Sequence, residues 1–187
     1  SKYFEKSTFN NTYAKDGELS AGGAIAVEGN MAIVTDSNFT NCYAYSGGML
    51  YVEGRRATLT NSNVTDCYAY DYGGAVYILE GEKTRIEAST FDNCTSINSQ
   101  GGALFIDGDF TVVSDSTFTN CNASSEDGLG GAVYIKGEET TIQSATFDGC
   151  TSVDGGAIYI EGDDVHISDS DFIGNTLVNY TNDDNYG

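Results

Sequence analysis

The chain of 187 residues contains no proline and no tryptophan, and it has only 8 basic residues against 28 acidic ones, a formal net charge of −20. A surface this acidic repels polyanions, so nucleic acids and anionic membrane surfaces are excluded as partners. No apolar run approaches the length of a membrane-spanning helix, so membrane insertion is not expected. The chain starts at Ser1 with no signal peptide, and we interpret it as a mature or excised piece.

Side chains suited to catalysis are scarce as well. The three arginines, Arg55, Arg56 and Arg85, share no repeated position, and the single histidine, His166, lies near Asp164. Lyases and hydrolases that act on polysaccharides need a basic residue or paired carboxylates that converge in a groove. The sequence therefore predicts that the protein is not an enzyme, and a polysaccharide-acting enzyme is the third interpretation of its function.

A repeat runs through the chain. Glycine pairs begin successive units at spacings of 25, 26, 28, 29 and 25 residues, at Gly22, Gly47, Gly73, Gly101, Gly130 and Gly155. A single glycine follows the start of each pair by 7 or 8 residues. An apolar residue, usually phenylalanine, stands 10 residues after that single glycine. These nearly constant spacings indicate backbone in register with the next unit, whereas the variable gap before each glycine pair indicates a surface loop.

Within each unit, apolar residues alternate with a period of two, as in "AVYI", and no window shows helical spacing. A unit of this size with two or three short strands is one coil of a parallel β-helix, because a single coil cannot bury its apolar face alone. We expect one domain over residues 1–187, with a partial first coil over 1–21, coils that start near 22, 47, 73, 101, 130 and 155, and a polar tail over 176–187.

Stacking turns equivalent apolar positions into ladders inside the solenoid. The first predicted ladder is Ile25, Leu50, Val76, Leu104, Val133 and Ile158. The second is Val34, Leu59, Ile86, Val113, Ile142 and Ile167. The third, expected at a corner, is Phe39, Val64, Phe91, Phe118, Phe147 and Phe172.

The motifs also carry a family resemblance. "GGAI", "GGAV" and "GGAL" recur, and "FIGN" at 172–175 keeps a phenylalanine-x-x-asparagine motif. Along nearly its whole length the chain resembles the polymorphic outer membrane protein repeat of bacterial and protist surface proteins. The resemblance implies an all-β fold, a right-handed, single-stranded parallel β-helix (solenoid) of about six to seven coils. Five units depart from it by placing cysteine where the family has asparagine.

Those cysteines are one per coil, at Cys42, Cys67, Cys94, Cys121 and Cys150. Adjacent members lie about one strand spacing apart, roughly 4.8 Å, but parallel in-register side chains point the same way. We expect an internal ladder of mostly free thiols, with room for one or two strained disulfides. A metal site is not expected in this column, because a stack is not a tetrahedron and no histidine joins it.

Six Asn-x-Ser/Thr triplets point to the compartment. They begin at Asn10, Asn38, Asn63, Asn93, Asn122 and Asn179, at the solvent side of corners or in the variable loop. Such positions can carry N-glycans, although a chain rich in Asn, Ser and Thr also produces triplets by chance. We therefore expect a secreted glycoprotein that is extracellular or on the cell surface.

Two further columns face outward. In most units an acidic residue precedes the single glycine that follows the glycine pair. Calcium is the one cofactor considered, and its candidate ligands are Asp107, Asp109, Glu161, Asp163 and Asp164. Solvated turn carboxylates are the plainer account of this column. The second column is an aromatic surface stripe of Tyr51, Tyr77, Phe105, Tyr134 and Tyr159, to which the loop tyrosines "CYAYS" and "CYAYDYG" add. Such a stripe suits sugar rings or a partner chain, and stacking that merely stabilises the sheet is the alternative.

The ends of the solenoid complete the prediction. Neither terminus shows a helical cap, and uncapped strand edges recruit other chains into head-to-tail contacts that propagate. The predicted edge residues are Tyr3, Phe4, Phe9, Val165, Ile167, Phe172 and Asn175. The leading hypothesis is a glycosylated structural subunit that stacks into an extracellular homopolymeric fibril. The alternatives are a stalk cut from a longer β-helix and a surface adhesin that presents its aromatic residues to glycan or protein.

Overall fold

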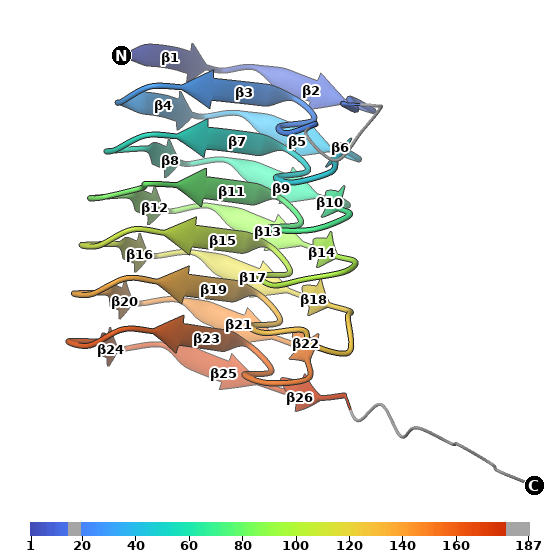
Figure 1. Ribbon diagram of the computed structural model, residues 1–187, viewed down its shortest axis with the longest axis vertical. Coiled ribbons are helices and arrows are strands. Elements are labelled where there is room, and N and C mark those ends of the chain that lie inside the picture. Colours follow the sequence, from blue (N-terminus) through green and yellow to red (C-terminus); the bar gives the residue numbers. More distant parts are fainter. Residues whose placement is uncertain (15–19, 179–187) are drawn as a thin grey trace, which may run out of the picture.

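A computed structural model describes residues 1–14 and 20–178, which form 26 β-strands and no helix. Figure 1 shows the strands stacked from the N-terminal coil to the C-terminal coil. All pairings are parallel, and the strands fall into four sheets that every full coil visits in the same order, here named walls 1 to 4. The predicted parallel solenoid is confirmed. In the described part of the chain, no helix has the length and apolar character needed to cross a membrane.

Walls 1 and 2 have seven strands each. Wall 1 contains β1 (Lys2–Glu5), β4 (Ala32–Thr35), β8 (Thr58–Thr60), β12 (Arg85–Glu87), β16 (Val112–Ser114), β20 (Thr141–Gln143) and β24 (His166–Ser168). Wall 2 contains β2 (Thr8–Asn10), β5 (Asn38–Thr40), β9 (Asn63–Thr65), β13 (Thr90–Asp92), β17 (Thr117–Thr119), β21 (Thr146–Asp148) and β25 (Asp171–Ile173).

Walls 3 and 4 have six strands each. Wall 3 contains β6 (Tyr43–Ala44), β10 (Tyr68–Ala69), β14 (Thr95–Ser96), β18 (Asn122–Ala123), β22 (Thr151–Ser152) and β26 (Thr176–Leu177). Wall 4 contains β3 (Ile25–Glu28), β7 (Leu50–Glu53), β11 (Val76–Leu79), β15 (Leu104–Asp107), β19 (Val133–Lys136) and β23 (Ile158–Glu161). A full coil thus has four strands, whereas the sequence predicted two or three. The prediction missed wall 3, because its two-residue strands are too short to show a hydrophobic period. β26 also takes the first two residues of the predicted polar tail.

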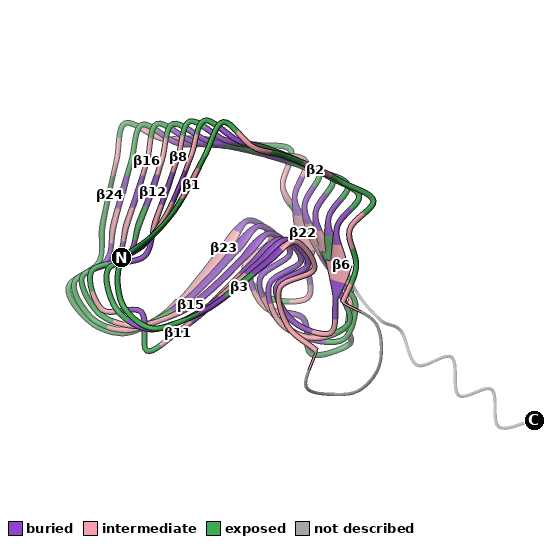
Figure 2. Ribbon diagram, turned by 90° about the horizontal axis from the view of Figure 1, so that it is seen from above, coloured by how far each residue is buried: buried purple, intermediate pink, exposed green. Residues whose placement is uncertain are grey.

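The three apolar ladders lie in register inside the solenoid, where Figure 2 shows the buried residues. Val133, Ile142 and Phe147 are fully buried, each on a different wall. Phe9 extends the phenylalanine ladder by one coil, since its ring is parallel to that of Phe39 with centroids 4.9 Å apart. The phenylalanines lie at the centre of each wall 2 strand, not at a corner as predicted.

The two corners that flank wall 2 are formed by residues in the left-handed region. At the corner between walls 1 and 2, φ is 47° to 52° in Lys6, Asp36, Asn61, Ala88, Asp115, Ser144 and Asp169. The corner between walls 2 and 3 repeats this conformation five residues later, from Asn11 to Gly174, with φ between 52° and 65°. Asn, Asp and Gly tolerate left-handed φ best, and these types fill most of the corner positions. The corners therefore explain why Asp and Asn recur before the serines and cysteines.

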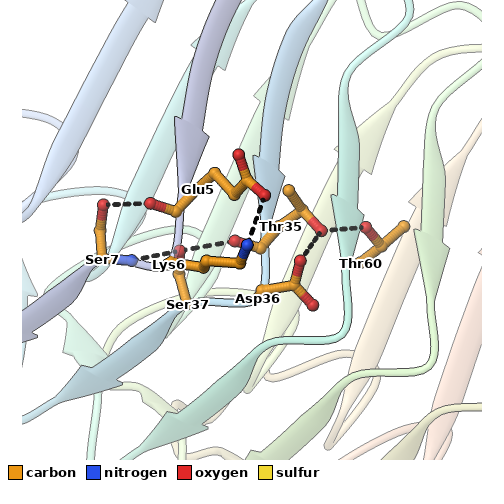
Figure 3. A network of polar contacts seen from close by, with 7 residues as sticks. All are labelled: Glu5, Lys6, Ser7, Thr35, Asp36, Ser37 and Thr60. Carbon is orange, nitrogen blue, oxygen red and sulfur yellow. Dashed lines mark hydrogen bonds and ion pairs between the residues drawn. The ribbon is translucent and has the colours of Figure 1, made fainter.

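A serine column lines the inside of the first corner, and sequence reasoning did not single it out. In Figure 3 the Ser7 amide donates to the Ser37 hydroxyl oxygen at 3.1 Å, and that hydroxyl donates to the Thr35 carbonyl at 2.8 Å. The same amide-to-hydroxyl bond, 3.2 Å long, joins Ser37 to Ser62, Ser62 to Ser89, and Ser89 to Ser116. The serines satisfy buried backbone amides that the turn removes from the ladders.

Candidate functional site

The N-terminal end coil leaves the outer edges of its strands unpaired within the described chain. β1 pairs only with β4, and β2 pairs only with β5. Tyr3 is 58% exposed, and Phe4 and Phe9 are half-buried above the ladders. Three predicted edge residues thus lie together at this open end.

The C-terminal end coil exposes the cross-section of the core. Ile167 and Phe172 are 45% and 49% exposed, although Ile142 and Phe147, their equivalents one coil earlier, are fully buried. Val165, also a predicted edge residue, is 41% exposed. A concavity of about 500 Å³ opens here, with an apolar lining that includes Ala157, Ile158, Ile160, Ile167, Phe172 and Leu177. The end coil therefore presents core-type side chains beside unpaired strand edges.

Asn175, the last of the predicted edge residues, lines the same concavity, and its half-buried side chain also bonds to the preceding coil. Its side-chain amide donates to the Phe147 carbonyl at 2.9 Å, and its side-chain oxygen accepts from the Cys150 amide at 2.9 Å. Both partners belong to the preceding coil, so Asn175 closes the column in which the cysteines lie.

All five cysteines are buried and free, as expected, and no disulfide joins them in the structure. The Cys150 thiol donates weakly to the Phe118 carbonyl, with 3.7 Å between sulfur and oxygen, which is the bond that Asn175 makes one coil later. Burial raises the pKa of Cys121 well above its ordinary value. Cys42 differs, because hydrogen bonds with Cys67 and Thr12 lower its pKa to about 7. The column therefore consists of small buried thiols that keep a weak form of the asparagine contact.

The predicted aromatic stripe is in register on the outer face of wall 4, but it is not a continuous exposed surface. Phe105 and Tyr134 are only 8% and 5% exposed, and their ring centroids lie 4.8 Å apart. Tyr72, in the variable loop, packs against Phe105 with centroids 4.7 Å apart. Tyr51, Tyr77 and Tyr159 are half-buried. Because the rings cover one another and loop residues pack on them, the stripe mainly stabilises the solenoid.

The exposed aromatic surface lies instead on wall 3. We name as the wall 3 tyrosine patch Tyr13, Tyr43, Tyr45, Tyr68 and Tyr70. Ring centroids are 4.7 Å apart for Tyr43 and Tyr68 and 5.2 Å apart for Tyr45 and Tyr70. Tyr13, Tyr68 and Tyr70 are 66%, 38% and 42% exposed. Four of the five loop tyrosines thus cluster on adjacent coils, whereas Tyr72 packs on wall 4. Tyr13, which forms a bridge with Tyr43, was missed.

The glycosylation candidates differ in accessibility. Asn10, Asn38, Asn63 and Asn93 are exposed, whereas Asn122 is half-buried and its side-chain oxygen accepts from the Thr151 hydroxyl at 3.0 Å. Asn38 and Asn63 are register neighbours on wall 2, and the Asn63 amide donates to the Asn38 oxygen at 3.0 Å. Asn179 lies outside the described residues.

The calcium candidates do not come together. In residues 1–14 and 20–178, no three His, Cys, Asp or Glu side chains are placed to hold a metal ion. Asp107 forms an ion pair with Lys136 at 3.7 Å, and the Asp109 side chain accepts from the Glu138 amide at 2.9 Å. Glu161, Asp163 and Asp164 are exposed at the last corner. The five calcium candidates therefore form no metal-binding cluster in the described residues.

Comparison with protein families agrees with this geometry. The family described as "right handed beta helix region" matches residues 1–124 and 48–185. The chain belongs to the right-handed β-helix family. Neither the curated proteins nor the solved structures gave a match. Membership of this family defines the fold of the chain and leaves its activity open.

Proposed function

We propose that this β-helix is an extracellular structural rod whose copies join head to tail through their end coils. The observation that carries the proposal is the contrast between Ile167 and Phe172, which are 45% and 49% exposed, and the fully buried Ile142 and Phe147 one coil earlier. Apolar side chains of this size rarely stay exposed beside unpaired strand edges, because such edges recruit further strands.

The two ends are complementary on walls 1 and 2. With β1 placed over β24 and β2 over β25, Phe4 of the second copy continues the column of Ile167, and Phe9 continues the phenylalanine ladder of Phe172. The ladder already steps by 4.9 Å between Phe118 and Phe147 and by 5.0 Å between Phe147 and Phe172. A contact between two different faces does not close on itself, so it propagates into a filament.

Sedimentation velocity and negative-stain microscopy test the stacking. The wild-type chain is expected to form filaments, and Phe172→Asp is expected to leave monomers, because the carboxylate lies in the junction. Phe110→Asp is the matched control, since Phe110 is 41% exposed at a lateral corner away from both ends. A wild-type chain that stays monomeric at its highest soluble concentration would overturn the proposal.

Mixing two blocked variants sharpens this test. Phe4→Asp blocks the N-terminal end and Phe172→Asp blocks the C-terminal end, so each variant alone is monomeric. A mixture contains one intact end of each kind and is expected to form heterodimers and nothing larger. Circular dichroism confirms that each variant is folded before it is mixed.

An extracellular location and N-glycans at Asn10, Asn38, Asn63 and Asn93 form part of this proposal, since all four side chains are exposed. The proposal also includes a relationship between this chain and the polymorphic outer membrane protein repeats. Mass measurement before and after glycosidase treatment of secreted material tests the glycans. We expect at least one of the four sites to be occupied and Asn122 to be empty, because Asn122 is half-buried.

A second candidate function, glycan binding, is favoured by the wall 3 tyrosine patch. Stacked tyrosine rings with partial exposure offer flat apolar faces for sugar rings. Quenching of tyrosine fluorescence by oligosaccharides tests this function, and no tryptophan masks the signal. Tyr68→Ala is expected to weaken the response, whereas Tyr159→Ala, on wall 4, leaves it unchanged.

A further inference from the structure

At the C-terminal end, wall 4 ends one strand earlier than walls 1, 2 and 3 in the described chain. Each full coil runs through walls 1, 2, 3 and 4 in turn, and the described chain leaves off on wall 3 with β26. The outer edge of β23 is therefore the position at which the next strand of the solenoid belongs. Within residues 1–14 and 20–178, no strand occupies that position.

Backbone donors point at the vacant position. In the preceding coil, the amides of Gly130, Gly131 and Ala132 donate to carbonyls of the last coil over 2.9, 3.1 and 2.8 Å. The equivalent amides of Gly155, Gly156 and Ala157 donate to no acceptor in the described part of the chain. Three adjacent N–H groups thus face the place where the carbonyl groups of a further strand would lie.

The space next to Gly156 has room for the backbone of a further strand. The second members of the glycine pairs form one column, which is Gly23, Gly48, Gly74, Gly102, Gly131 and Gly156. Along this column, the carbonyl of the next coil's glycine takes the position that a Cβ atom would need, as Gly156 does for Gly131. Gly156 itself meets only Thr176, at 2.9 Å from that position. A carbonyl group therefore fits over Gly156 as it does over the other members of the column.

The side-chain environment defines what the strand must carry. Wall 4 strands place two aliphatic residues inward, two positions apart, and in β19 these residues, Val133 and Ile135, are fully buried. In β23 the corresponding Ile158 and Ile160 are only half-buried, and both line the concavity of about 500 Å³. The vacant position therefore accepts an aliphatic-x-aliphatic segment.

The sequence of residues 179–187 does not carry that pattern. Residues 179–187, "NYTNDDNYG", contain no isoleucine, leucine or valine. A second copy stacked with β1 over β24 brings β3 as its first wall 4 strand, and β3 then lies two strand steps from β23. Such a junction contains a slot one strand wide, since one step is about 4.8 Å.

We propose that the exposed edge of β23, with the concavity beside it, is a strand-acceptor site. Its ligand is an extended segment of another polypeptide with the pattern Gly-Gly-Ala-aliphatic-aromatic-aliphatic, added in parallel register. Backbone bonds to Gly155, Gly156 and Ala157 provide affinity, and the two inward aliphatic side chains provide specificity. The proposed site needs the residues of one chain only, so the inference does not depend on filament formation.

A labelled peptide with the sequence of residues 155–162, GGAIYIEG, tests the site by fluorescence anisotropy. The assay uses the Phe4→Asp chain, because stacking of copies cannot compete there. We expect saturation at one peptide per chain. The peptide GGADYDEG, in which both inward isoleucines are replaced by aspartate, is expected to bind about tenfold more weakly or not at all.

Protein variants locate the peptide. Gly156→Ala places a methyl group where the incoming carbonyl belongs and is expected to weaken binding by about tenfold. Ile173→Asp is the matched control, because Ile173 is 52% exposed on the outer face of wall 2. Hydrogen exchange is expected to show new protection of the amides of Gly155, Gly156 and Ala157 when the peptide is bound.

The outcomes separate this inference from the proposed function. Peptide binding by a chain that never forms filaments supports the acceptor site and refutes the stacking. Filaments without peptide binding support the stacking and refute the acceptor site. Equal binding of GGAIYIEG and GGADYDEG, or binding without protection of the three amides, overturns the acceptor site.

Discussion

Phe118 lies parallel to Phe147 in the neighbouring coil, with ring centroids 4.9 Å apart and an angle of 2° between the ring planes. Both rings are fully buried, whereas Phe172, one step further along the ladder, is 49% exposed. The same residue type in the same column thus lies in two environments, which allows the contribution of the stack to be measured.

Phe118→Ala is expected to lower the free energy of unfolding by about 3–5 kcal/mol, because it leaves a cavity between two rings. Phe172→Ala is expected to cost less than half of that value, since the ring keeps only one stacking neighbour. Chemical denaturation followed by circular dichroism measures both variants. Equal losses would contradict the argument that burial between two neighbouring rings sets the cost.

Ala88 adopts a φ of 47° at the corner between walls 1 and 2. An L-residue with a Cβ atom is strained there by about 1–2 kcal/mol, and glycine is not. Ala88→Gly is therefore expected to raise the free energy of unfolding by about 0.5–1 kcal/mol, after the extra entropy of the unfolded chain is subtracted. Asn61→Ala, at the equivalent position one coil earlier with a φ of 48°, is expected to lower it. A loss of stability in Ala88→Gly would contradict the corner argument.

Thr140 and Thr84 occupy equivalent buried positions but differ in their hydrogen bonds. The Thr84 hydroxyl donates to the Gly81 carbonyl at 2.5 Å, whereas the Thr140 hydroxyl has no partner in the described part of the chain. Thr140→Val removes an unsatisfied buried group and is expected to stabilise the protein by about 1 kcal/mol. Thr84→Val is expected to destabilise it by a similar amount. Thermal melts of the two variants in parallel check the opposite signs.

Burial raises the pKa of Asp71 above its ordinary value of 3.8, against an opposing hydrogen bond with Ser99. A carboxyl group whose pKa is raised in the folded state contributes fully below its unfolded pKa, and stability is lost as the pH rises through the folded pKa. Asp71→Asn keeps a hydrogen-bonding side chain and removes the charge. The variant is expected to melt at a higher temperature than wild type near pH 7, and the difference is expected to vanish below about pH 4. A difference that persists at low pH would point to packing instead.

Much of the fold followed from spacing alone. The glycine pairs, the alternation in "AVYI" and the constant distance to the phenylalanines predicted in-register coils, and the pairs Val133 with Ile158 and Phe118 with Phe147 confirm that register. The left-handed corners and the serine column were not predicted. Their residues are polar and exposed or small, and neither class shows a hydrophobic period.

The spacing of the repeats is enough to tell which residues share a column, because every coil must repeat the backbone path of the coil beneath it. How each member of a column is covered depends on contacts that only the folded chain shows. Tyr72 closes over Phe105, the Asn175 side chain turns into the thiol column, and the amides of Gly155, Gly156 and Ala157 have no acceptor in the described part of the chain. Burial depends on neighbours on both sides of a strand and on the loops that pack against it. Equivalent positions in the middle and at the end of the solenoid therefore look the same in the sequence and differ in space.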